Sequence, residues 1–64
     1  MNVYVVMEST RIDTPFATIY IRSAMFIYAL HEDAIKRVAQ LEKDRDDELM
    51  PNIVGYYYTI KEVL

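Results

Sequence analysis

The side chains best suited to acid–base chemistry in this sequence gather around its only histidine, His31. Glu32 and Asp33 follow it directly, so an imidazole and two carboxylates are available for proton transfer. A catalytic constellation also needs further groups positioned around such a base. The sequence has no cysteine and no second histidine, and no serine stands in a supporting pattern. We therefore interpret His31 as a helix-start or surface residue and expect no enzymatic activity.

A cluster of carboxylates follows further along the chain and raises the question of a cation site. An EF-hand calcium loop needs a glycine at its turn and a glutamate at its twelfth position, and neither is present here. Two interpretations remain. The cluster is an acidic patch that docks onto a basic partner or mimics nucleic-acid phosphates, or it is a solvated helix end and loop. Its members are Glu42, Asp44, Asp46, Asp47 and Glu48.

The composition gives no support for a cofactor or a metal. With no cysteine and a single histidine, the usual ligands of structural zinc are missing. The single glycine, Gly55, cannot build a glycine-rich phosphate loop. Arg22 lies in an apolar segment, and we expect it to reach the sheet edge or to pair with a carboxylate such as Glu8 or Glu62. We expect no cofactor and no metal.

The length of 64 residues fits one domain, residues 1–64, near the lower limit of autonomous folding. A core of this size rarely supplies more than ~3–5 kcal/mol, and no disulfide can add to it, so association is the remaining route to stability. The net charge of −3 argues against nucleic-acid binding. The apolar stretch from Phe16 to Leu30 is too short for a membrane span of ~20 residues. Met1–Val3 has no charged signal-peptide region, and we expect a cytoplasmic protein.

Hydrophobic patterning predicts the element order β-β-α-β. The β-branched run Val3–Met7 is typical of a central strand. The alternative for residues 23–30 is a helix that begins at Ala24 and is capped by Ser23. The predicted segments are a first strand at Val3–Met7, a loop at Glu8–Pro15, a second strand at Phe16–Ala29 bulged near Arg22–Ala24, a helix at His31–Glu48 and a last strand at Gly55–Val63.

The predicted fold is an α+β domain with a three-stranded, mainly antiparallel sheet. Its first strand lies in the middle, and one helix packs on one face. Ala34, Ile35, Val38 and Leu41 follow the spacing of an amphipathic helix. Pro51 marks the end of the segment that the helix can occupy.

One helix leaves one face of the sheet uncovered. Side chains alternate along a strand, which gives an aliphatic set (Val3, Val5, Met7, Ile19, Ile21) and an aromatic set (Tyr4, Val6, Tyr20, Phe26, Tyr28). We expect the helix to cover the aliphatic set and the aromatic face to form a homodimer interface, because tyrosine is enriched at interfaces. The alternatives are an exposed aromatic surface without a partner and a small-molecule pocket. The expected interface residues are Tyr4, Tyr20, Phe26, Tyr28 and Tyr57.

Three places carry a likeness to known proteins: the opening Val3–Ser9, the strand end Ile27–Ala29 followed by the acidic helix start Glu32–Ile35, and the closing Pro51–Leu64. Together they resemble small bacterial and phage proteins of a β-β-α-β domain-of-unknown-function family. The hydrophobic run Ala24–Leu30 departs from that pattern. The resemblance implies the fold, and it suggests by analogy a protein that binds and blocks a host protein.

The sequence therefore predicts a non-enzymatic protein-interaction module that works as a homodimer, of the kind that phages use as an inhibitor or adaptor against a host protein. The alternative is a regulatory domain that binds a small molecule at the aromatic face of the dimer.

Overall fold

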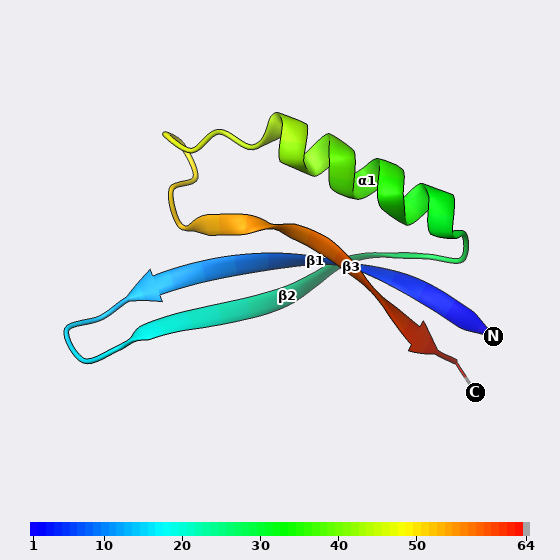
Figure 1. Ribbon diagram of the computed structural model, residues 1–64, viewed down its shortest axis with the longest axis horizontal. Helices are drawn as coiled ribbons and strands as arrows, with labels where there is room; N and C mark the ends of the chain where they lie inside the picture. Colours follow the sequence, from blue (N-terminus) through cyan, green and yellow to red (C-terminus); the bar gives the residue numbers. More distant parts are fainter. Residues whose placement is uncertain (64) are drawn as a thin grey trace.

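The computed structural model, described over residues 1–63, has three antiparallel strands in the order β2-β1-β3 and one helix against the sheet (Figure 1). This confirms the predicted β-β-α-β arrangement, with the first strand in the centre. It also settles residues 23–28 as strand, so the alternative helix from Ala24 is wrong. The elements are β1 (Asn2–Asp13), β2 (Thr18–Tyr28), α1 (His31–Asp44) and β3 (Ile53–Glu62).

The first two strands form a longer hairpin than the sequence suggested. Glu8 pairs with Ser23 and Asp13 pairs with Thr18, so the predicted loop over residues 8–15 is wrong. Pairing with β2 holds the polar residues of β1 in strand conformation, and local composition alone does not predict such pairing. The connecting loop is limited to residues 14–17, where the Thr14 amide donates to the Ala17 carbonyl (2.9 Å).

A one-residue bulge in β2 divides the two predicted residue sets. Val6 pairs with Phe26 whereas Met7 pairs with Ala24, so Met25 is the extra residue. A bulge reverses the alternation of side chains. The register places Tyr28, Phe26, Ser23, Ile21 and Ile19 on the helix side of the sheet, and Ile27, Ala24, Arg22 and Tyr20 on the opposite side. The predicted bulge lay one residue earlier, within Arg22–Ala24.

The helix covers the face that we expected to be open. Ala34 of α1 and Val6 of β1 are both 0% exposed and mark the centre of the core. Tyr4 shares the face of Val6, and Phe26 and Tyr28 lie across from them in β2. The predicted placement of the aliphatic set beneath the helix is therefore wrong. The reason is the size of the side chains. Ala34 lets the helix approach Val6 closely, and the larger aromatic rings flank that contact.

Helix α1 ends at Asp44, four residues before the predicted end at Glu48. Arg45 has an extended backbone (φ −68°, ψ 128°), which ends the helix and turns the chain toward β3. Glu32 and Asp33 lie in the first turn, where their negative charges interact favourably with the positive end of the helix dipole. The last strand begins at Ile53, two residues earlier than predicted.

The molecule is thin and elongated, with a small core. Its Cα atoms extend 43 × 26 × 10 Å and its radius of gyration is 13.5 Å, compared with about 11 Å for a compact domain of this length. Among residues 1–63 the buried hydrophobic side chains are Val5, Val6 and Ala34. The tip of the β1–β2 hairpin projects beyond β3 and away from α1 (Figure 1). We call residues 12–20 the hairpin arm.

Candidate interaction surface

Tyrosine and histidine rings pack together where α1 begins. His31 stacks on Tyr4 with ring centroids 5.0 Å apart, and its Nε2 atom shares a hydrogen bond with the Tyr58 hydroxyl (2.6 Å). Tyr4 and Tyr58 meet edge to face at 6.3 Å. His31 is thus a helix-start residue, and its ring joins the helix to β1 and β3. Its partners are aromatic rings and a phenol, a set that serves packing.

A second group of rings holds the middle of α1 to β2. The Arg37 guanidinium lies over the Phe26 ring, 4.6 Å from its centroid, in cation–π geometry. The same guanidinium donates through Nε to the Tyr28 hydroxyl (2.8 Å). Phe26 and Tyr28 are therefore engaged inside the protomer by a helix side chain.

These contacts divide the five residues that the sequence suggested as one interface. Tyr4, Phe26 and Tyr28 lie beneath or beside α1, so they do not form an open sheet face. Tyr20 and Tyr57 lie on the other side of the sheet, where Tyr20 pairs with Arg11 and Tyr57 pairs with Met7. Tyr20 is separated from Phe26 and Tyr28 because the bulge at Met25 changes the face of the residues that precede it. Tyr57 lies on the face of Met7 because of the register of β3 with β1.

The sheet surface opposite α1, which we call the open face, is apolar in its centre and basic around it. Ile27 is 68% exposed, next to the central Val5. The residues that the register places on the open face are Val3, Val5, Met7, Ser9, Arg11, Asp13, Thr18, Tyr20, Arg22, Ala24, Ile27, Gly55, Tyr57, Thr59 and Lys61. They carry three basic side chains and one acidic side chain, whereas the whole chain has a net charge of −3.

A shallow hollow of about 400 Å³ lies on this part of the sheet. It is lined by Ser9, Arg22, Val54, Gly55, Tyr56 and Tyr57. A Cβ atom at Gly55 would lie 3.0 Å from Glu42 Oε1 of α1, so the glycine makes room for that carboxylate. A guanidinium, a hydroxyl and an aromatic ring around one depression are groups that can bind a small polar aromatic molecule.

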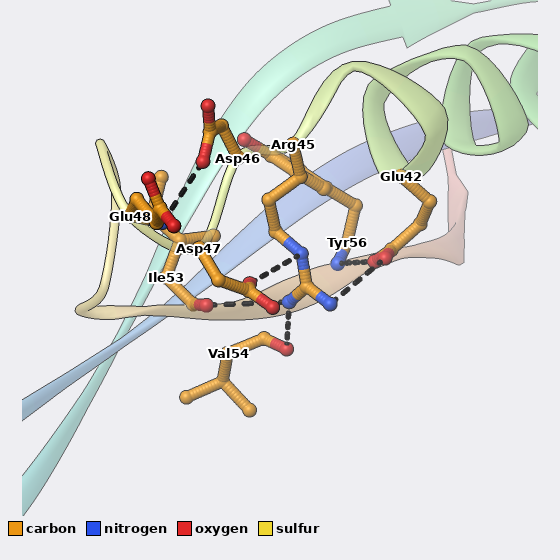
Figure 2. Close-up of polar contacts among 8 residues, drawn as sticks. All are labelled: Glu42, Arg45, Asp46, Asp47, Glu48, Ile53, Val54 and Tyr56. Atoms are coloured by element: carbon orange, nitrogen blue, oxygen red, sulfur yellow. Dashed lines mark hydrogen bonds and ion pairs between the residues drawn. The ribbon is translucent and has the colours of Figure 1, made fainter.

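The edge of β3 beside Gly55 is closed by two side chains, Glu42 and Arg45, which we call the edge latch (Figure 2). Glu42 Oε1 accepts a hydrogen bond from the Tyr56 amide (2.6 Å). Arg45 Nη1 donates to the carbonyl of Ile53 (3.2 Å) and to that of Val54. The two latch residues also form an ion pair with each other at 3.5 Å. Exposed strand edges are templates for aggregation, and the latch satisfies this edge within the protomer.

Most of the predicted acidic patch supports this latch or its loop. Asp47 pairs with Arg45 (3.7 Å), and Asp46 accepts from the Glu48 amide (2.9 Å). Asp44 accepts from Gln40 (2.9 Å). Partial burial raises the pKa of Tyr56, and the nearby carboxylates of Glu8 and Glu42 raise it further. The sequence did not indicate the latch, because Glu42 and Arg45 reach groups that lie 8–14 residues away along the chain.

In contrast, β2 and the hairpin arm have little protein around them. Every residue from Arg11 to Met25 is exposed, and the arm carries Ile19, Tyr20 and the 97% exposed Phe16. Arg11 and Asp13 form a surface ion pair at 3.0 Å near the hairpin tip. The Thr18 hydroxyl, which donates to Asp13, and the Arg11 guanidinium together lower the pKa of the Asp13 carboxyl.

No group of three or more histidine, aspartate or glutamate side chains within residues 1–63 is arranged to hold a metal ion. The helix in this part of the chain is too short and too polar to cross a membrane. Comparisons with protein-family models, curated proteins and solved structures found no match to the chain. The resemblance to a β-β-α-β family of bacterial and phage proteins therefore stays a prediction.

Proposed function

We propose that this chain is a non-enzymatic protein-interaction module that works as a homodimer. The observation that carries the proposal is the imbalance between surface and core. The protomer exposes 5028 Å², about 700 Å² more than the roughly 4,300 Å² expected of a compact monomer of its mass. A standard interface covers about 800 Å² on each partner. The excess surface is thus close to what one protomer contributes to a stable interface.

The position of the apolar residues supports the same proposal. The isolated protomer buries Val5, Val6 and Ala34 among its described residues. The open face and the arm present Ile27, Ile19 and further apolar side chains to solvent. Exposed apolar side chains that the small core leaves uncovered are the surface that an interface would bury. A second copy of the chain is the partner that is always present at the same concentration.

In this proposal the dimer acts as an inhibitor or adaptor that binds a host protein, by analogy with small acidic proteins of phage genomes. The charge distribution supports a basic target. Residues 31–48 contain seven acidic and four basic side chains, which accounts for the net charge of −3, while the remaining residues are balanced. Opposite charges speed association and help select the partner.

The experiment that tests homodimer formation is light scattering coupled to size-exclusion chromatography over a range of micromolar concentrations. We expect a dimer that dissociates on dilution. Ile21→Asp places a charge on the exposed strand β2, where Ile21 is 44% exposed, and should weaken the dimer by at least about tenfold, with an unchanged far-UV circular dichroism spectrum. The matched control is Ile35→Asp on the helix, where Ile35 is 46% exposed. A monomer at every concentration would remove the proposal.

A second candidate is a regulatory domain that binds a small molecule, and the hollow beside Arg22 and Tyr57 favours it. A thermal-shift screen against nucleotides and aromatic metabolites tests it. A ligand that binds this hollow should stabilise the natural chain and lose its effect in Arg22→Ala. The absence of any stabilising compound, or stabilisation that survives this substitution, speaks against the candidate.

A further inference from the structure

The two edges of the sheet differ in how their backbone groups are satisfied. The edge of β3 near α1 is closed by Glu42 and Arg45, which bond to the Tyr56 amide and to the carbonyls of Ile53 and Val54. The outer edge of β2 has no such cover, and residues 18–25 are exposed throughout. A long uncovered strand edge is a ready template for another strand.

The hydrogen bonds of the hairpin show which β2 groups point outward. The Arg11 amide donates to the Asn52 carbonyl on the β3 side, so it does not bond to its β2 partner, Tyr20. Thr14 donates to Ala17 at the hairpin end. Bonded and non-bonded pairs alternate along an antiparallel ladder. This alternation turns the amides and carbonyls of Thr18, Tyr20, Arg22 and Ala24 away from β1, until the bulge at Met25 ends the regular edge.

We propose that β2 pairs with β2 of a second copy of this chain, antiparallel and centred on Ile21, so that the two sheets join into one of six strands. This inference rests on the proposed homodimer and specifies its geometry. Around a twofold axis at Ile21, each Tyr20 faces the partner's Arg22 and each Thr18 faces the partner's Ala24. These are the residues whose backbone groups point outward, so four bonded pairs form.

Other registers are less complementary. Centring the axis on Arg22 would place two guanidinium groups opposite each other, and like charges in that position destabilise a sheet. Centring it on Tyr20 gives three bonded pairs, because Ala24 then lies beyond the regular strand of the partner. The axis at Ile21 places each guanidinium beside a tyrosine ring, which allows a cation–π contact. It also brings the two Ile21 side chains together on the helix side of the joined sheet.

Cysteine cross-linking tests this register, because the natural chain contains no cysteine. Directly opposed residues of a non-bonded antiparallel pair have Cα atoms about 4.5 Å apart, within the range of a disulfide. Ile21→Cys should therefore form a covalent dimer under mild oxidation at least about tenfold faster than Ala39→Cys on the exposed side of α1. Thr59→Cys, which lies on the other edge strand, β3, and on the opposite face of the sheet, is the strand control and should be slow. An equimolar mixture of Ile19→Cys and Ser23→Cys should form the mixed dimer in preference to either homodimer.

Amide hydrogen exchange of the natural chain gives a second readout that does not depend on substitutions. Protection of Thr18, Tyr20, Arg22 and Ala24 should rise with protein concentration, while Ile19 and Ile21, bonded to β1, should change little. If light scattering shows a dimer but Ile21→Cys links no faster than Ala39→Cys, or Thr59→Cys is the fast variant, the β2 register is wrong and the homodimer stands. If the chain is a monomer at all concentrations, both proposals fail.

Discussion

Removing the carboxylate of the edge latch should destabilise the fold more than any other single loss of charge. In Glu42→Ala, the Tyr56 amide loses the acceptor that now lies 2.6 Å away. Arg45 loses an ion-pair partner at 3.5 Å. Both latch side chains are partly shielded from solvent, with exposed fractions of 36% for Glu42 and 23% for Arg45. Water can therefore replace the lost acceptor only in part.

The magnitude follows from these two contacts. A hydrogen bond to a charged group contributes about 1.5–3 kcal/mol, and a partly exposed ion pair adds at most about 0.5 kcal/mol. The higher helix propensity of alanine offsets a few tenths, roughly 0.4 kcal/mol. We expect a loss of about 2 kcal/mol, which is a large share of the ~3–5 kcal/mol that a core of this size supplies. In a domain this small such a loss lowers Tm by about 10 °C. Glu42→Gln keeps an acceptor and should lose about half as much.

Urea denaturation followed by circular dichroism measures this change. All variants must be compared at one protomer concentration, because association adds to the apparent stability. Glu48→Ala is the matched control, because it removes an equal charge from the same acidic cluster and should lie within about 0.5 kcal/mol of the natural chain. The exchange rate of the Tyr56 amide reports the contact itself and should rise in Glu42→Ala. Equal stabilities of Glu42→Ala and Glu48→Ala, with unchanged protection of Tyr56, would refute the latch.

Two further predictions concern the core and the hairpin. Val6→Ala should lower the free energy of unfolding by about 2 kcal/mol, because it removes two fully buried methyl groups and leaves a cavity. The control is Val63→Ala at a partly exposed site, which should lower the free energy of unfolding by well under half of that in the same urea titration. Thr18→Val should raise the pKa of Asp13 toward its ordinary value of 3.8 in a carbon-13 NMR titration, since the Thr18 hydroxyl is the main group that lowers it. Because the folded-state pKa is lowered, the Asp13 carboxylate stabilises the fold above about pH 3.8 and this contribution is lost as the pH falls through the folded-state value; a pKa unchanged by Thr18→Val would contradict that cause.

The fold could be predicted from the sequence because its strongest signals are local. The run Val3–Met7 is β-branched and apolar, and the stripe that includes Ala34 and Val38 has helical spacing. Each of these segments adopts the expected conformation. The strand order then follows from the small number of elements, because the rules for connecting three strands and one helix leave few possible arrangements.

The faces on which the β2 side chains lie could not be predicted, because they depend on one residue. Met25 occupies a bulge, and nothing in its side chain distinguishes it from a regular strand residue. Moving that extra residue along β2 transfers every side chain beyond it to the other face. The pattern of residues 18–28 is compatible with either outcome. Tyr20 was therefore grouped with Phe26 and Tyr28, although the bulge separates them.

The dimension of the helix explains why the uncovered part of the sheet lies at β2 and the hairpin arm. A helix of 14 residues is about 21 Å long, whereas β1 has 12 residues and extends for about 40 Å. The helix therefore covers roughly half of the hairpin. The Glu42–Arg45 latch fixes the C-terminal end of α1 at β3. The half of the hairpin that α1 leaves uncovered is therefore the arm and the outer edge of β2. A second protomer related by a twofold axis at Ile21 would lie against that half, which ties the position of the latch to the position of the proposed interface.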